Sequence, residues 1–304
     1  MKEKFNVRLC VDLRRNWSLY LLILPVVIIY LLFCYKPMYG ALIAFQDYRP
    51  ARGFGEEWVG FKHFVDFFSS PYLGRLIRNT FLISLLELIF GFPAAIGLAL
   101  LLNEAKNSKF KKISQMVMHL PHFVSLVVVC GLVKQFCLSD GLINDIMSIF
   151  GMERFSLLQK EELYRPIYVI SGIWKDLGWN SLIYVAALSG VDAELYDAAS
   201  VDGAGKWMQT LHVTVPGILP TIVVMLILNV GRMMSVGYEN TLLLYNETIY
   251  ETADIISAYV YRYGLVSQDW SYSTAVGLFN SVVNVFLVVT ANYISKKVTE
   301  TSLW

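Results

Sequence analysis

The chain has 304 residues, of which 56% are hydrophobic and 16% are charged, and its mean hydropathy is +0.52. Soluble domains are about a quarter charged, so this composition indicates that lipid forms part of the solvent. The net charge of +1 argues against a nucleic-acid partner, because such a partner normally requires a strongly basic surface.

Six segments have the apolar length of roughly 20 residues that a bilayer core requires. They predict membrane spans at 17–35, 79–102, 113–136, 166–190, 217–236 and 273–295. Helix is the expected state of each span, because lipid offers no hydrogen-bond partners to an open backbone. The sequence therefore predicts an all-α membrane protein with one six-span domain over 17–295, flanked by tails at 1–16 and 296–304.

The first apolar segment follows basic residues, as the core of a signal peptide does. It is too long for such a core, and no A-x-A cleavage site follows it, so we expect it to remain as a span. Five basic residues precede it, four lie in 103–112, and Lys296 and Lys297 lie in the C-terminal tail. This distribution predicts that both termini, the 103–112 loop and the 191–216 loop face the cytoplasm.

The segments expected to face outward are 36–78 and 137–165. Within them, 61–68 and 140–151 have apolar residues at helical spacing. This pattern fits helices that lie in the membrane interface, and it fits equally well helices that pack against the outer rim of the protein.

A polar segment at 192–216 separates the fourth and fifth predicted spans. Asp192 is a suitable N-cap for a short helix over 193–202, and Gly203 suits a sharp turn after it. A second short helix over about 205–214 would carry Trp207 and Leu211 on one face, because they are four residues apart. Pro216 and Pro220 fit the first turns of the next span, where a missing N–H costs little.

The segment ELYDAASVDGAGKWMQTLHVTVPGILP (194–220) resembles the cytoplasmic coupling loop of ATP-binding-cassette (ABC) importer permeases. The family pattern reads EAA, two residues, DGA, and later Ile-x-Leu-Pro. The residues that match it are Asp197, Ala198, Ala199, Asp202, Gly203, Ala204, Val213, Val215 and Pro216. Asp197 departs from the pattern, because the family commonly has Glu there. The resemblance implies that the Asp, Ala, Gly and Pro residues of this set, with Trp207 and Leu211, couple the chain to an ATPase.

The resemblance extends to the six-span layout and to three further stretches: NWSLYLLILP, YKPMYGALIAFQDY and NTLLLYN. These look like the oligosaccharide-importing branch of the family. The resemblance implies the type I ABC importer permease fold in a bacterial inner (plasma) membrane. It also implies a heterodimer with a second, homologous permease, two ATPase subunits and an extracytoplasmic solute-binding protein. ATP and Mg would bind to the ATPase, since the sequence has no G-x-x-x-x-G-K-[ST] loop; no cofactor is expected in this chain.

Polar and aromatic side chains in the last three spans suit a sugar, which presents both C–H faces and hydroxyl edges. The candidates are Trp174, Lys175, Trp179 and Asn180 in span four, Asn229, Arg232, Tyr238 and Asn240 on or near span five, and Asn280 and Asn284 in span six. For any single Asn, hydrogen bonding between helices is an equally good explanation.

Ionisable residues inside spans need partners or a wet cavity. Glu87 lies about 12 Å below the outer end of span two, and Arg232 lies at a comparable depth on span five, so we hypothesise that they pair or share a polar network. Lys175 and Asp176 are sequence neighbours, so we expect them to point in different directions, one or both toward the pore.

The sequence does not favour a metal or disulfide site. His119 and His122 flank Pro121, and two imidazoles without an acidic or thiol neighbour fit a kinked helix with polar packing better than a metal site. The four cysteines, Cys10, Cys34, Cys130 and Cys137, have no C-x-x-C spacing and are expected to be packing residues.

Several other functions remain as alternatives to an oligosaccharide permease. An importer of a non-sugar solute such as a metal or polyamine would be expected to have acidic or His-rich pore faces. A stand-alone secondary transporter would be expected to show an internal repeat with broken helices. A membrane enzyme would need clustered acid–base or metal groups. None of these patterns stands out, so we expect a transport subunit that is not itself an enzyme.

Overall fold

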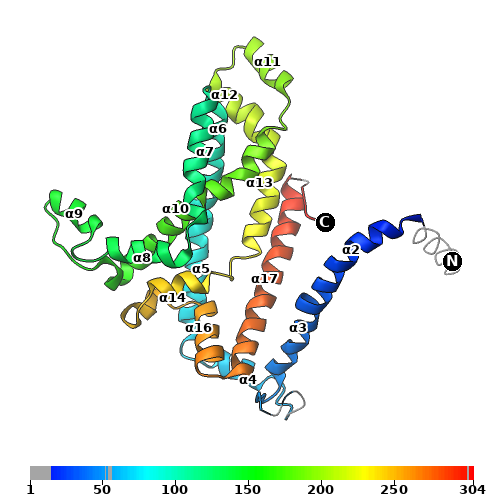
Figure 1. Cartoon of the computed structure of the whole chain (residues 1–304), viewed down its shortest axis with the longest axis vertical. Coiled ribbons are helices and arrows are strands. Elements are labelled where there is room, and N and C mark those ends of the chain that lie inside the picture. Colours follow the sequence, from blue (N-terminus) through cyan, green and yellow to red (C-terminus); the bar gives the residue numbers. More distant parts are fainter. Residues whose placement is uncertain (1–14, 52, 54–56, 300) are drawn as a thin grey trace.

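The computed structural model describes residues 15–51, 53, 57–299 and 301–304, and these parts of the chain are almost entirely helical (Figure 1). Within them, an isolated bridge between Gln46 and Trp58 is the one strand-like pairing. The basic tail residues Lys2, Lys4, Arg8 and Arg14, on which part of the predicted orientation rests, lie outside the described residues, and so does Cys10.

Most helices follow the predicted apolar segments. The α-helices are α2 (Trp17–Tyr30), α3 (Lys36–Met38), α4 (Lys62–Phe68), α5 (Leu73–Leu86), α6 (Phe92–Glu104), α7 (Ser108–Phe123), α8 (Leu126–Phe136), α9 (Leu142–Ile149), α10 (Glu161–Leu188), α11 (Ala193–Val201), α12 (Lys206–Gln209), α13 (Val215–Val230), α14 (Tyr238–Leu244), α15 (Tyr250–Ala253), α16 (Ile256–Tyr261) and α17 (Trp270–Thr299). Short 3₁₀ or π-helical turns join several of them into longer rods.

Four helical rods in the described residues are long and apolar enough to cross a membrane. They are Trp17–Phe45, Leu73–Glu104, Lys206–Val230 and Trp270–Thr299. The pair α7 and α8 makes a fifth if it counts as one span. The helix expected as span four, α10, has 28 residues but does not belong to this group. It is less apolar and carries Lys175 and Asp176 in its middle.

The predicted third span, 113–136, is not one straight helix. The axes of α7 and α8 meet at 94°, with the break after Phe123. Val124 has an extended backbone, with φ −75° and ψ 134°. Pro121 lies just before the break and cannot donate a helical hydrogen bond, which weakens the last turn of α7.

Three prolines inside the long rods are preceded by π-helical turns. The turns Leu31–Tyr35, Glu87–Gly91 and Thr210–Thr214 each end two residues before a proline. A proline leaves a carbonyl of the preceding turn without its usual donor, and a π-helical turn alters the pairing where that bond is lost. The predicted helix over 205–214 therefore does not stop before span five. It runs through Pro216 and Pro220 as part of the rod Lys206–Val230.

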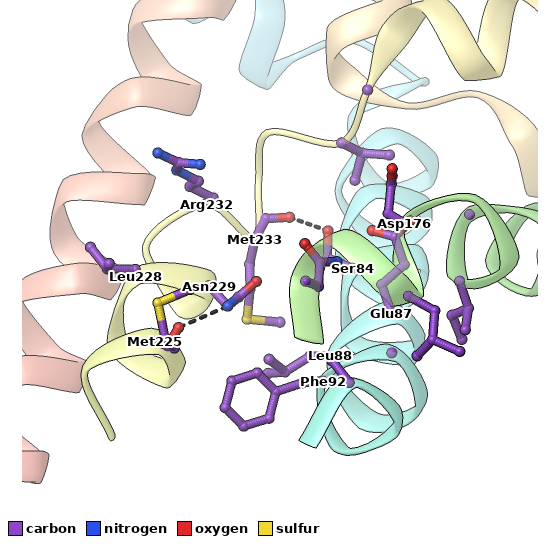
Figure 2. A pocket seen from close by; sticks show the side chains of 18 of the residues that line it. Ser84, Glu87, Leu88, Phe92, Asp176, Met225, Leu228, Asn229, Arg232 and Met233 are labelled. Carbon is purple, nitrogen blue, oxygen red and sulfur yellow. Dashed lines mark hydrogen bonds between the residues drawn. The ribbon is translucent and has the colours of Figure 1, made fainter. Parts of the chain in front are cut away.

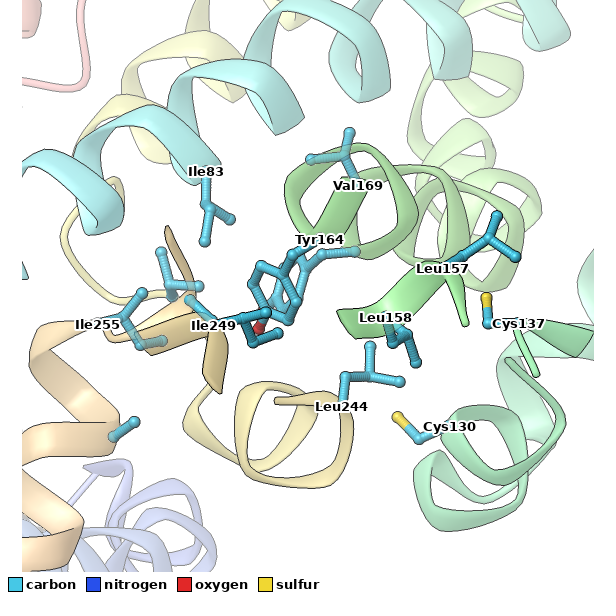
Figure 3. Packing of buried hydrophobic residues seen from close by; sticks show 14 residues of the cluster. Ile83, Cys130, Cys137, Leu157, Leu158, Tyr164, Val169, Leu244, Ile249 and Ile255 are labelled. Carbon is cyan, nitrogen blue, oxygen red and sulfur yellow. The ribbon is translucent and has the colours of Figure 1, made fainter. Parts of the chain in front are cut away.

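The helix α10 is at the centre of the packing. Part of its length lines a cavity (Figure 2), and its first half lies in the largest apolar cluster of the chain (Figure 3). In that cluster, Tyr164 and Tyr168 meet Ile83 of α5, Leu244 of α14 and Ile255 next to α16. A second cluster joins α6, α10 and α13 through small and branched residues, which allow the helix backbones to approach closely.

A buried ion cluster fixes the segment between α13 and α17 to the rest of the protein. Asp254 is fully buried and accepts hydrogen bonds from Arg262 at 2.8 and 2.9 Å and from Arg75 of α5 at 3.0 Å. Asn79 of α5 donates to the backbone carbonyls of Asp254 and Glu251, both at 3.0 Å. Two guanidinium groups therefore compensate the burial of the Asp254 carboxylate, and the Asn79 amide ties the backbone of the same segment to α5.

The two outward helices behave differently. In α4, Phe67 is buried against Phe279 and Tyr272 of α17, so this segment packs on the rim of the protein. In α9, Asn144 holds the helix in place with hydrogen bonds to the carbonyls of nearby loops, yet Ile149 remains 80% exposed. The apolar face of α9 therefore still fits an interfacial helix.

The first helix diverges from the bundle. Figure 1 shows α2 running away from α17, and α2 buries none of its residues. The rod contacts the bundle through Tyr39–Phe45, which packs on α17. The apolar surface of α2 is thus left for lipid or for another protein.

We predict that Asp254→Asn lowers the free energy of unfolding by about 3–5 kcal/mol, because Arg75 and Arg262 keep their charges in a buried place. The matched control is Asp145→Asn, since the Asp145–Arg154 pair is half exposed and should contribute less than about 1 kcal/mol. Thermal unfolding of the purified protein in detergent measures both. Equal shifts for the two variants would contradict a special role for the buried cluster.

Candidate functional site

Two regions carry the residues singled out in the sequence. One is the 192–216 loop with α11 and α12, which lies at one end of the molecule, far from α4 and α16 at the opposite end (Figure 1). The other is the cavity beside α10 (Figure 2).

The first part of the 192–216 loop has the N-cap and the turn that its sequence predicts. The side chain of Asp192 accepts a hydrogen bond of 3.0 Å from the backbone N–H of Glu194, as expected of an N-cap. Gly203 ends α11 with φ +79°, a conformation that other residues rarely adopt. The backbone N–H of Ala204 then donates to the carbonyl of Ala199 at 2.9 Å, which closes the turn. The predicted N-cap and glycine turn are both confirmed.

Two polar side chains that the sequence did not single out hold the loop together. Gln209 is buried and donates to Ser200 Oγ at 2.9 Å and to the carbonyl of Ala204 at 3.0 Å. The hydroxyl of Tyr196 donates to Thr214 Oγ1 at 3.1 Å. These bonds join α11 to the rod that begins at Lys206, so the loop is a folded unit. Gln209 and Ser200 are nine positions apart, and Tyr196 and Thr214 are eighteen apart. The three- and four-residue spacing of helical neighbours does not predict such pairs.

Five apolar side chains of the loop are exposed, and together they are here called the ridge: Leu195, Val201, Trp207, Met208 and Leu211. Val201 is 88% exposed and Trp207 is 75% exposed. Of the predicted coupling residues, Asp197, Ala198, Asp202 and Pro216 are also exposed, whereas Ala199 and Ala204 are partly covered. Exposed tryptophan, methionine and aliphatic side chains at one end of a membrane protein have the composition of a protein-binding surface.

We predict that Gly203→Val distorts this loop, because a branched residue at φ +79° costs on the order of 1–2 kcal/mol. Gly205→Val is the matched control: it lies two residues away, has φ −71° and also has open space around its Cα. Limited proteolysis of the loop should be faster in the Gly203 variant than in the control. Equal protection would mean that the positive φ is not required.

The cavity has a volume of about 500 Å³ and lies between α5, the turn after it, α10 and the end of α13. Its polar lining residues are Ser84, Glu87, Asp176, Asn180, Tyr184, Asn229, Arg232 and Ser235. Apolar side chains such as Leu88, Phe92 and Met225 complete the walls. The hydroxyl of Ser84 donates to the carbonyl of Met233, which ties the chain after α13 to α5 (Figure 2). Such a mixture of apolar and polar groups is typical of a small-molecule site.

Three of the ten predicted pathway residues line this cavity: Asn180, Asn229 and Arg232. The amide of Asn229 donates to the carbonyl of Met225 at 2.8 Å and leaves its oxygen available. Arg232 was expected on span five, but α13 ends at Val230, so Arg232 lies in the turn that follows.

The other candidates lie elsewhere. Tyr238 and Asn240 belong to α14 and not to span five; Tyr238 stacks on Tyr261, and Asn240 accepts a bond of 3.1 Å from Cys130 Sγ. Asn284 bonds to Met234 N and Ser235 Oγ, and the oxygen of Asn280 is buried without a partner in the described residues. Trp174 is exposed, and Trp179 stacks on His122 with 4.4 Å between ring centres.

An ionic group joins α7 to α10 at the edge of the cavity. Asp176 Oδ1 lies 2.8 Å from His122 Nδ1 and 3.2 Å from Lys175 Nζ. The expectation that Lys175 and Asp176 point in different directions is therefore wrong, because the flexible lysine folds back to its neighbour. Nor does an ion pair join Glu87 to Arg232 in the described residues, although both line the same cavity.

The histidines have hydrogen-bonding roles within the helices. His119 bonds through Nδ1 to the carbonyl of Gln115 one turn earlier, and His122 meets Asp176. In the described parts of the chain, no three His, Cys, Asp or Glu side chains gather closely enough to hold a metal ion.

Comparisons with known proteins give the family to which this chain is similar. Residues 88–300 match the family described as "Binding-protein-dependent transport system inner membrane component". Over 305 residues, the chain is 45% identical to the "Polygalacturonan/rhamnogalacturonan transport system permease protein YteP" of Bacillus subtilis (strain 168), covering 100% of this chain and 95% of that protein. It is also 45% identical over 295 residues to "Protein LplB" of the same organism, covering 96% and 92% of the two chains.

A similar solved structure is the "Crystal structure of bacterial alginate ABC transporter in complex with alginate pentasaccharide-bound periplasmic protein". One of its chains superposes on this chain with a TM-score of 0.89 and 43% sequence identity. The superposition covers 97% of this chain and 100% of that one. The likeness thus extends over nearly the whole fold.

Proposed function

Because this chain belongs to the family of binding-protein-dependent transport system inner membrane components, we propose that it forms one half of a pore for an oligosaccharide cut from an acidic polysaccharide. The chain is the permease subunit of an ABC importer, it crosses the inner membrane several times, and ATP hydrolysis belongs to a separate subunit. The proposed substrate class rests on the names of its relatives and on a cavity lined by amide, hydroxyl and ionic groups.

The observation that carries the proposal is the exposed ridge on the 192–216 loop. Trp207 and Leu211 are exposed there, and the loop is braced from within by Gln209. We infer that this ridge docks on an ATPase subunit, in which ATP and Mg bind. A braced loop transmits a rigid-body movement of the ATPase, which an unstructured loop would absorb.

In this proposal the chain spans the membrane six times and both termini face the cytoplasm. The bent pair α7–α8 and the charged helix α10 complete the six spans alongside the four apolar rods. Lys175 and Asp176 are tolerated in α10 because they pair with each other and because Asp176 borders the cavity.

A second, homologous permease would form the other half of the pore. The apolar surface of α2, which this chain leaves uncovered, is available to that partner or to lipid. An extracytoplasmic solute-binding protein would deliver the oligosaccharide at the end opposite to the ridge, where α4 and α16 lie.

We predict that affinity purification of the tagged chain from its native membrane in mild detergent recovers a second permease and a nucleotide-binding subunit. Trp207→Glu should lose the nucleotide-binding subunit and keep the second permease, because it replaces a large exposed apolar side chain of the ridge with a charge. The matched control is Trp58→Glu, since Trp58 is 59% exposed and shortly precedes α4, which lies at the end of the molecule opposite to the ridge (Figure 1).

Mass spectrometry of the co-purified proteins gives the result. A chain that is purified alone, or with copies of itself only, would contradict the proposal. Such a result would favour a stand-alone transporter. Loss of the nucleotide-binding subunit from both tryptophan variants would mean that the ridge is not its docking surface.

A further inference from the structure

The cavity beside α10 contains a guanidinium group without an ion partner. Arg232 lies two residues beyond the end of α13, lines the cavity and is exposed. Its side chain makes no hydrogen bond or ion pair with any residue that the structure describes. Among membrane-spanning helices, an unpaired guanidinium is costly unless water or an anion reaches it.

Charge is distributed unevenly across the cavity. Glu87 and Asp176 lie on one wall, and Figure 2 shows the guanidinium of Arg232 on the other side of the cavity from both. Asp176 is compensated by Lys175 and His122, and Glu87 lies against the backbone of α10 at Gly172. An anionic ligand is therefore attracted toward Arg232, which is the one cationic side chain among the described residues that line the cavity.

The backbone that carries Arg232 is held on both sides. Gly231 lies so close to α17 that a Cβ would come within 2.8 Å of Val288. The N–H of Met234 donates to Asn284 Oδ1 at 3.0 Å, and the carbonyl of Met233 accepts a bond from Ser84. The backbone from which the Arg232 side chain extends is thus held in place, so that binding of an anion at the guanidinium orders the side chain and not the turn.

Neutral polar groups lie on the same side of the cavity. Asn229 keeps a free amide oxygen, and Ser235 is bound by Asn284 through its hydroxyl oxygen, which leaves the hydroxyl hydrogen available. These groups match sugar hydroxyls, whereas the planar fork of a guanidinium matches a carboxylate with two parallel hydrogen bonds. A sugar acid presents both kinds of group on one ring.

We propose that Arg232 binds the carboxylate of a uronate unit during passage and so makes the pathway selective for acidic over neutral oligosaccharides. This inference rests on the proposed function and adds to it the residue that recognises the charge. The permease then selects its substrate by charge, separately from any selection that the solute-binding protein makes. Asn229 and Ser235 contact hydroxyls, which acidic and neutral sugars share, and so do not discriminate between them.

The test compares two probes that differ at their carboxyl groups: trigalacturonate, and its trimethyl ester, in which a methyl group replaces each negative charge. The complete transporter, with its second permease, ATPase and solute-binding protein, is reconstituted in liposomes, and ATP-driven uptake of each probe is measured at a saturating concentration. The quantity of interest is the ratio of the uptake rate of the acid to that of the ester. Variants are Arg232→Gln, Arg232→Lys and the remote control Arg154→Gln, whose side chain pairs with Asp145 near α9.

We expect Arg232→Gln to lower the acid-to-ester ratio about tenfold, because it removes a charge-assisted hydrogen-bonded pair. Arg232→Lys should retain part of the selectivity, since it keeps the charge and loses the fork. Arg154→Gln should leave the ratio unchanged. Recovery of the complete complex and its ATPase activity show that each variant is folded.

Three outcomes would overturn the inference. If Arg232→Gln slows both probes by the same factor, Arg232 has a general role in the pore. If that variant releases the second permease, Arg232 pairs with a carboxylate of the partner. In both cases the proposed function stands, because the wild type still imports the probes. If the wild type with ATP imports neither probe, the proposed acidic substrate fails, and the role of Arg232 fails with it.

Discussion

Every polar group within a membrane needs a partner in the protein or access to water. This requirement is strongest for α10, which carries Lys175 and Asp176 in its middle. Asp176 meets Lys175 on its own helix and His122 of α7. Two residues further on, Gly178 lies so close to α7 that a Cβ would come within 2.1 Å of the carbonyl oxygen of Met118. The close approach at Gly178 brings the two helices together, and the same stretch of α10 lines the cavity. Close packing, charge compensation and the cavity lining thus share one stretch of α10.

The rod Lys206–Val230 connects the two candidate regions. It begins at the exposed ridge, where Trp207 lies, and ends at the cavity, where Asn229 and Arg232 lie. A helix of 25 residues spans about 38 Å, and the π-helical turn before Pro216 keeps it continuous. Movement of a protein docked at the ridge would therefore reach the cavity without passing through a flexible joint. At the other end of the molecule, the cluster around Asp254 anchors the chain that follows the cavity.

Caps and turns that depend on neighbouring residues could be predicted from the sequence, whereas contacts between residues that are far apart in the sequence could not. The Asp192 cap and the Gly203 turn follow from local rules, and the structure confirms them. The bend after Phe123 and the continuity through Pro216 depend on how each proline is accommodated, which the apolar pattern does not specify. The contact of His122 with Asp176 joins residues 54 positions apart. Of the cavity lining, Asn180, Asn229 and Arg232 were expected because polar residues in spans are rare, whereas Ser84 and Ser235 gave no such signal.

The most direct test of an ATP-driven pore is uptake of a labelled acidic oligosaccharide by liposomes that contain the purified complex. We predict that uptake requires ATP inside the liposomes and the solute-binding protein outside, and that ionophores which collapse ion gradients leave it unchanged. Uptake by this chain alone, driven by an ion gradient without ATP, would contradict the assignment of the ridge to an ATPase and of the cavity to a shared pore.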